Sequence, residues 1–309
     1  MPKVILREMG LRDGLQSIAT IVPTQAKTEW IRAAYDAGER EIEVGSFVPA
    51  RLLPQLADTA EVLKFAQTLP GLRASVLVPN MRGAERAMEC NAELMLLPLS
   101  ASHAHSLANL RKAPDDVVAE IGRIRDARDA AGSRTKIEVG ISTAFGCTIQ
   151  GRVDESEVVR LVQAVLDEGV DCVGLADTVG YADPAQVKRL FEKVLRVAGD
   201  KLNCAHFHDT RGLGLANCFA AYEMGITRFD ASTGGIGGCP HAPGASGNVA
   251  MEDVVYMFES MGVPTGLDFD KLMRLRGRIG EWLQGESLHG AIWRAGLPKT
   301  MATKEVAHA

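Results

Sequence analysis

Residues 154–177 read DESEVVRLVQAVLDEGVDCVGLAD and contain one complete helix–strand unit. After the acidic start, apolar residues recur at helical spacing, and Gly169 follows where the helix would stop. Asp154 and Glu157 predict a capping box, in which each side chain accepts a hydrogen bond from a free backbone amide of the first turn. The apolar run at 171–176 predicts a strand that is buried on both faces. This stretch therefore predicts a helix that packs on a parallel sheet.

The same alternation of strand and helix runs along the whole chain. Short apolar runs rich in β-branched residues are separated by longer helical patterns. The predicted strands are 3–7, 41–44, 73–78, 93–98, 135–141, 171–176, 202–208 and 227–233. Eight such units favour an α/β fold of the closed (β/α)8 TIM-barrel type, and an open doubly wound sheet is the alternative. No G-x-G-x-x-G follows the first predicted strand, so a dinucleotide-binding sheet has no direct support.

The predicted barrel occupies almost the whole chain. We expect residues 1–298 to form a single TIM-barrel domain and 299–309 to be a disordered tail. An additional C-terminal helix is expected at 267–283. Asp183 and Pro184 predict the start of an earlier helix, because an aspartate N-cap precedes a proline at the first helical position.

Composition and charge exclude several classes of protein. The 309 residues are 46% hydrophobic and 24% charged, as in ordinary globular proteins. The net charge of -5 argues against nucleic acid as a partner, because no basic surplus exists to neutralise phosphates. No apolar run reaches the roughly 20 residues of a membrane span. The first residues lack the apolar core of a secretion signal, so a cytoplasmic location is expected. Six cysteines without a C-x-x-C pair predict reduced thiols.

Polar residues at the ends of the first and seventh predicted strands are candidates for an active site. Active sites of such barrels lie at the carboxyl ends of the strands. Arg12 and Asp13 follow the first strand, where a surface turn is an equally good interpretation of these two residues alone. His206 and His208 end the seventh strand. Strand alternation places both imidazoles on one face, so they can bind one ion above the barrel.

A glycine-rich segment follows the eighth predicted strand. Residues 234–248 read GGIGGCPHAPGASGN, which excludes a regular helix or strand and allows close approach to a ligand. Cys239 is its one thiol. Asn248 ends the segment, and an N-cap of the helix expected near Met251 is the alternative interpretation of this asparagine.

Four of these residues form a candidate metal site. Asp13, His206, His208 and Asn248 offer two oxygens and two imidazole nitrogens. Such a set suits Mg²⁺ or Mn²⁺ in six coordination, with Zn²⁺, Co²⁺ and Fe²⁺ as competitors. Two coordination positions would stay open for a substrate.

The segments that carry these residues resemble those of the 3-hydroxy-3-methylglutaryl-CoA lyase family. The similar segments are 10–16, 43–47, 177–180, 206–210 and the Gly-Gly-Cys-Pro loop, and the resemblance extends from about residue 3 to about 290. It implies a TIM barrel that cleaves 3-hydroxy-3-methylglutaryl-CoA to acetyl-CoA and acetoacetate by a metal-assisted retro-Claisen reaction. The family's metal ligands match the four residues named above.

The resemblance also implies catalytic roles. Arg12 matches an arginine that stabilises the thioester enolate, and Glu43 matches a glutamate that handles the substrate. Asp177 matches an acidic residue near the base, and Cys239 matches the cysteine that protonates the departing carbanion. The identity of the general base stays open between His206 and Asp177. If His206 binds the metal, only its second ring nitrogen is free to accept a proton.

Substrate contacts are less well defined by the resemblance. It implies that Gln16, Ser46 and Asn109 contact an acyl-CoA thioester. The chain departs from the family at 17–19, which lack an asparagine and a basic residue, and at Gly174, which replaces a serine. A related substrate such as citramalyl-CoA is therefore the alternative.

Two other enzyme classes share parts of this pattern. Claisen-type synthases carry the same metal site with a long C-terminal extension, and amidohydrolase-like barrels carry H-x-H after the first strand. Neither feature occurs in this sequence. The pattern leaves the oligomeric state open, and a homodimer is one assembly that it allows.

Overall fold

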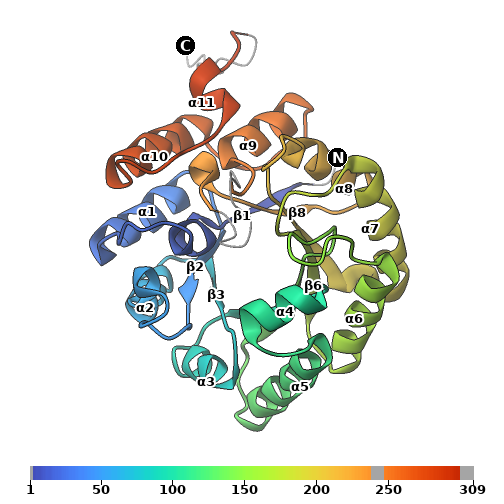
Figure 1. Cartoon of the computed structure of the whole chain (residues 1–309). Helices are drawn as coiled ribbons and strands as arrows, with labels where there is room; N and C mark the ends of the chain where they lie inside the picture. The colour runs from blue at the N-terminus through green and yellow to red at the C-terminus, as the bar shows by residue number, and fades with distance from the viewer. Residues whose placement is uncertain (1–2, 238–246, 300–309) are drawn as a thin grey trace.

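The computed structural model describes residues 3–237 and 247–299, and these form a closed barrel of parallel strands. The strands follow one another in chain order around the barrel, and the first pairs with the last (Figure 1). They are β1 (Ile5–Glu8), β2 (Glu41–Ser46), β3 (Arg73–Leu77), β4 (Leu94–Ser100), β5 (Lys136–Ser142), β6 (Cys172–Asp177), β7 (Leu202–Phe207) and β8 (Arg228–Ala231). The predicted TIM barrel is confirmed, and the open sheet is excluded.

Most helices form an outer ring around these strands, whereas α4 (His103–Leu110) lies nearer the barrel centre and α11 (Ala291–Ala295) projects beyond the ring (Figure 1). The other helices are α1 (Thr24–Asp36), α2 (Thr59–Ala66), α3 (Met81–Glu89), α5 (Pro114–Ala130), α6 (Glu155–Asp167), α7 (Pro184–Ala198), α8 (Gly214–Glu223), α9 (Met251–Ser260) and α10 (Phe269–Trp282). Within the described ranges, no helix combines the length and apolar character that a membrane span requires.

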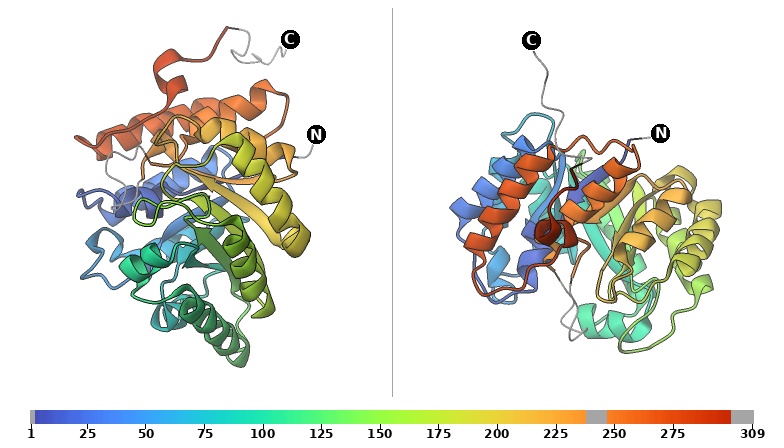
Figure 2. Two further views of the ribbon diagram at one scale, coloured as in Figure 1. Left: turned by 45° about the vertical axis from the view of Figure 1, so that its right-hand side comes forward. Right: turned by 90° about the horizontal axis from the view of Figure 1, so that it is seen from above.

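The additional C-terminal helix is α10, and its position confirms the prediction for 267–283. It lies against α1 on one side of the barrel (Figure 2). The rings of Trp30 and Trp282 stack across this contact with centroids 6.3 Å apart. Trp30 is fully buried, so α10 covers an apolar patch of α1 that would otherwise face water. The predicted tail lies outside the described residues except for its first residue.

Two predicted helix starts have different outcomes. Asp183 accepts hydrogen bonds from the amides of Ala185 and Gln186, as expected for an N-cap that precedes proline. The prediction of a capping box at the start of α6 is wrong, because the side chain of Asp154 makes no capping hydrogen bond. It pairs instead with Arg152 at 3.2 Å. The amide of Glu157 donates to the backbone carbonyl of Asp154 at 3.0 Å, so it does not need the carboxylate.

The barrel interior contains charged side chains where the strand pattern predicts an apolar core. Arg7 of β1 donates to Asp230 of β8 at 2.7 Å and to Glu138 of β5 at 2.8 Å. All three residues are at most 3% exposed. Buried charges are tolerated when they are paired and hydrogen-bonded. This network connects three strands across the barrel and forms the floor beneath the site.

Candidate active site

A cavity of about 820 Å³ opens at the carboxyl ends of the strands. Its wall includes Arg12, Asp13, His206 and His208, and its floor includes Arg7 of the buried ion-pair network. A larger depression of about 1200 Å³ lies at the opposite end of the barrel. The smaller cavity is the candidate active site, because it contains the predicted ligands and lies where TIM-barrel active sites form.

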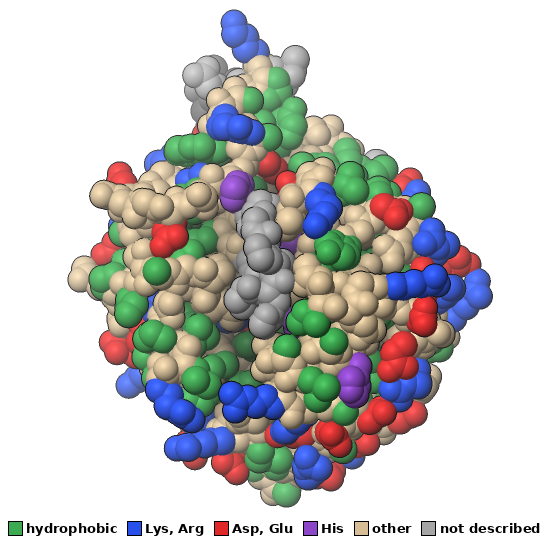
Figure 3. Space-filling view, viewed as in Figure 1, with side chains coloured by type: hydrophobic (Ala, Val, Ile, Leu, Met, Phe, Trp, Pro, Cys, Tyr) green, Lys and Arg blue, Asp and Glu red, His purple; other side chains and the backbone are tan. Residues whose placement is uncertain are grey.

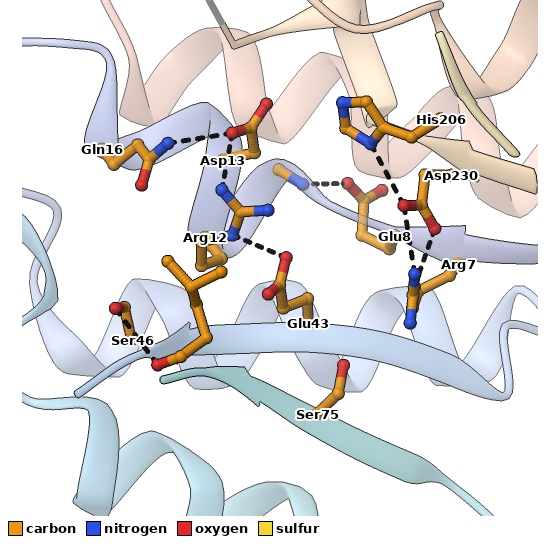
Figure 4. A network of polar contacts seen from close by, with 12 residues as sticks. Arg7, Glu8, Arg12, Asp13, Gln16, Glu43, Ser46, Ser75, His206 and Asp230 are labelled. Carbon is orange, nitrogen blue, oxygen red and sulfur yellow. Dashed lines mark hydrogen bonds and ion pairs between the residues drawn. The ribbon is translucent and has the colours of Figure 1, made fainter. Parts of the chain in front are cut away.

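A single turn after β1 positions Arg12 and Asp13. Residues Gly10–Gly14 form a short π-helical turn in which three successive amides bond to the carbonyl of Met9. The turn places both side chains at the barrel mouth, where Arg12 Nη1 donates to Asp13 Oδ1 at 2.6 Å (Figure 4). Gln16 Nε2 also donates to Asp13 Oδ1, at 2.9 Å. The surface-turn interpretation is excluded, because Arg12 and Asp13 are 8% and 6% exposed.

The four predicted metal ligands converge on one place. Donor atoms of Asp13, His206 and His208 lie within 4.8 Å of one another. Asn248 forms an isolated β-bridge with His208, and its Nδ2 lies 2.7 Å from Asp13 Oδ2. Ala250, and not Asn248, is the N-cap of α9, so the N-cap interpretation of Asn248 is wrong.

Gly237 allows the close contact between Asn248 and Asp13. Its φ of 138° lies in the region that side chains rarely adopt. A Cβ at this position would lie 2.3 Å from Asn248 Nδ2 and 3.1 Å from Asp13 Oδ2. The glycine-rich segment therefore approaches the cluster closely, as predicted. Cys239 lies outside the described residues.

The electrostatics keep Asp13 ionised and His206 oriented. Burial alone raises the pKa of Asp13, but Arg12 and His208 outweigh it and hold the pKa well below its usual range. Burial alone lowers the pKa of His206, whereas the hydrogen bond to Asp230 raises it above the ordinary value. Asp230 Oδ2 lies 3.1 Å from His206 Nδ1, which leaves Nε2 as the free ring nitrogen.

This arrangement fits a divalent cation. Asn248 Oδ1 is buried and has no hydrogen-bond partner among the described residues, as expected of an oxygen reserved for an ion. The set combines hard oxygens with imidazole nitrogens, which suits several divalent metals. Metal-binding histidines usually donate their second N–H to a carboxylate, and the His206–Asp230 pair has this geometry.

We predict that Asp230→Asn weakens Mn²⁺ binding about 10- to 100-fold, because the variant loses the charge that orients and polarises His206. Isothermal titration measures this dissociation constant. Glu138→Gln is the matched control, since it removes the other ion pair of Arg7 and leaves the contact to His206. Equal losses of affinity in both variants would show that Asp230 acts only through the stability of the barrel.

The remaining predicted residues differ in their distance from the cavity. Gln16 and Asn109 line it, as expected for substrate contacts. Ser46 does not, because its hydroxyl accepts from the amide of Val48 and donates to the carbonyl of Leu77. The role of Ser46 stays a prediction.

The two predicted acidic residues Glu43 and Asp177 are both buried. Glu43 accepts from Arg12 Nε at 2.6 Å, and burial raises its pKa in spite of this cation. Asp177 accepts from the amides of Tyr181 and Ala182 at 2.8 and 3.0 Å. Asp177 thus stabilises the turn before α7 and does not line the cavity. Its role near the base stays a prediction.

The cavity residues that sequence reasoning did not assign to the site include Arg7, Glu138, Asp230 and His105. Three of them are charged residues within strands that are otherwise apolar, and this contrast was the available signal. His105 lies on α4, where its Nδ1 is 3.0 Å from the hydroxyl of Ser100.

Behind the site, Glu39 is a buried carboxyl whose oxygens have no hydrogen-bond partner among the described residues. Burial, and then the nearby Glu8, raise its pKa well above the usual value. Burial also raises the pKa of Glu8 to about 7. The folded state therefore holds more protons than the unfolded state above about pH 4.5, so stability falls as the pH rises.

We predict that Glu39→Gln stabilises the protein more at pH 8 than at pH 5, because the amide cannot ionise. Urea unfolding of both proteins at the two pH values measures the difference in the free energy of unfolding. A variant that differs from wild type by the same amount at both pH values would show that Glu39 does not titrate in this range.

A closed (β/α)8 barrel with a carboxylate–imidazole cluster at its mouth defines a TIM-barrel protein with a candidate metal centre. The family model HMGL-like matches residues 3–279, and the chain belongs to this family.

Known relatives agree with this assignment. Hydroxymethylglutaryl-CoA lyase of Bacillus subtilis is 39% identical over 271 residues, covering 88% of this chain and 90% of that protein. The mitochondrial enzyme of Bos taurus is 36% identical over 271 residues, covering 88% and 83%. A solved HMG-CoA lyase from Acinetobacter baumannii, in complex with coenzyme A and 3-methylmalate, superposes with a TM-score of 0.91 at 40% identity over 97% of both chains. The predicted resemblance is confirmed.

Proposed function

We propose that this chain is a carbon–carbon lyase that cleaves 3-hydroxy-3-methylglutaryl-CoA to acetyl-CoA and acetoacetate. The observation that carries the proposal is the convergence of Asp13, His206, His208 and Asn248 beside the guanidinium of Arg12. The names of the relatives in the same family support the same reaction.

The reaction requires one proton to leave and one carbanion to be stabilised. The tertiary alcohol of the substrate loses its proton, and its carbon becomes the ketone of acetoacetate as the C–C bond breaks. The bond electrons form the enolate of acetyl-CoA, which then takes up a proton. A divalent cation held by the four ligands would lower the pKa of the alcohol and polarise its oxygen.

We assign the stabilisation of the enolate to Arg12. Its guanidinium is held by Glu43 and Asp13, both at 2.6 Å, so it needs no reorganisation when charge develops. Asp177 does not line the cavity, and a His206 that binds the cation through Nε2 and donates from Nδ1 to Asp230 has no nitrogen left for the alcohol proton. The choice of general base between these two residues therefore stays open. We assign the return of the proton to Cys239, on the family resemblance alone.

Basic side chains at the cavity mouth support an acyl-CoA substrate. Arg51, Arg111 and Lys112 line the outer part of the cavity, and such cations bind phosphate groups. Basic side chains gather at the mouth on the side of α2 and α3 (Figure 3). Arg111 and Lys112 follow Asn109 closely and supply the positive charge that its immediate neighbours lack.

A substrate assay with metal-free protein tests this proposal. The protein is supplied in turn with Mg²⁺, Mn²⁺, Zn²⁺, Co²⁺ or Fe²⁺ and offered 3-hydroxy-3-methylglutaryl-CoA or citramalyl-CoA. We expect cleavage of the first substrate with Mg²⁺ or Mn²⁺ and much slower cleavage of the second. Inactivity with every metal would refute the proposed reaction. A homodimer and a cytoplasmic location stay predictions.

A further inference from the structure

Two neighbouring strands contribute no side chain to one row of the barrel interior. Gly140 of β5 and Gly174 of β6 are direct partners in the sheet, and Gly174 is also the partner of Cys204 of β7. All three residues line the active-site cavity. Bulky branched side chains usually fill the interior of a TIM barrel. We call the space beside these three residues the glycine recess.

The backbone does not explain these two glycines. Neither Gly140 nor Gly174 is among the residues with positive φ, so other residues could adopt both conformations. A Cβ on Gly140 would meet no heavy atom of the described chain within 4 Å. A Cβ on Gly174 would lie 3.3 Å from the Cβ of Cys204. The open space therefore lies mainly at Gly140, where a side chain would fit without strain.

The glycine recess lies in the same cavity as the ligand cluster, one inward-facing row below His206. Cys204 precedes His206 by two residues on the same face of β7, which corresponds to about 7 Å along the strand. Below the recess, Glu138 and Arg7 form the buried ion pair. A substrate bound through its alcohol oxygen to the ligand cluster would have this free volume in the row below it, toward Gly140 of β5.

We propose that the glycine recess holds the substituent on the carbinol carbon and accepts groups larger than methyl. This inference rests on the proposed function and extends the substrate class to 3-hydroxyacyl-CoA thioesters with a 3-ethyl branch. One added methylene in a pocket changes specificity by about 10- to 200-fold. Filling the recess should therefore act selectively on the larger substrate.

The test compares 3-hydroxy-3-methylglutaryl-CoA with its 3-ethyl homologue. We expect wild type to cleave both with kcat/KM values within about tenfold of each other. Gly140→Ala should lower the ethyl-to-methyl ratio of kcat/KM by at least about tenfold. Gly277→Ala is the matched control, because its added methyl group lies outside the cavity in ordinary contact with Trp293 at 3.7 Å. It should leave the ratio unchanged.

Binding separates this inference from the proposed function. Isothermal titration without divalent metal gives dissociation constants of both thioesters in the absence of turnover. A Gly140→Ala variant that changes the ratio of dissociation constants supports the recess even if neither thioester is cleaved. The inference is overturned if wild type rejects the ethyl homologue. It is also overturned if Gly140→Ala leaves the ethyl-to-methyl ratios of both kcat/KM and the dissociation constants unchanged.

Discussion

His208→Ala should remove bound divalent metal and lower the cleavage of 3-hydroxy-3-methylglutaryl-CoA by at least about 10³-fold, the scale expected when the group that polarises the reacting oxygen is lost. His208 Nε2 lies 3.5 Å from Asp13 Oδ2 within the candidate ligand cluster. Its loss leaves three of the four candidate ligands. Elemental analysis of the purified variant and Mn²⁺ titration measure the metal directly.

His105→Ala is the matched control for this experiment. His105 is a buried imidazole in the same cavity, but it lies outside the ligand cluster. The control should keep its metal even if its stability falls as much as that of His208→Ala. Unchanged metal content in His208→Ala would remove this residue from the ligand set.

Arg12→Gln should reduce kcat by about 10³-fold while metal binding is retained, because removing one donor to a developing oxyanion costs about 10²–10³ in rate. The substitution also removes a cation that competes with the metal for Asp13. We therefore expect the dissociation constant of Mn²⁺ to stay the same or to decrease. Steady-state kinetics and Mn²⁺ titration on one preparation measure both quantities.

Arg51→Gln provides the comparison, since Arg51 lines the outer cavity far from the ligand cluster in our proposal. We expect this variant to raise KM with little change in kcat, as when uniform binding is lost. The same kinetic pattern in Arg12→Gln would mean that Arg12 binds the ground state and does not stabilise the enolate.

The fold was predictable because its signal repeats along the chain. Each strand is a short apolar run between helical patterns, and the predicted and observed strands differ only by a few residues at their ends. The convergence of the four candidate ligands was predictable for the same reason, since a barrel brings all strand ends together. Asp13 and Asn248 are 235 positions apart in sequence and only 2.7 Å apart in space.

Other features depend on side-chain directions that the sequence pattern does not contain. The strand pattern marks Asp230 as a polar interruption, whereas only the barrel geometry shows that it contacts His206. Asp177 is the last residue of β6, one position beyond the predicted strand, and its carboxylate accepts hydrogen bonds from two amides of the following turn. The capping box at Asp154 does not form, because its carboxylate pairs with Arg152 and the amide of Glu157 donates to the carbonyl of Asp154.

The most direct test of the metal site is anomalous diffraction from crystals of the protein grown with Mn²⁺. We predict one strong peak at about 2.0–2.3 Å from a carboxylate oxygen of Asp13, an imidazole nitrogen of each of His206 and His208, and the amide oxygen of Asn248. A peak elsewhere, or a peak at this place that the Asn248 amide or the Asp13 carboxylate does not contact, would contradict the proposed centre and the reaction that depends on it.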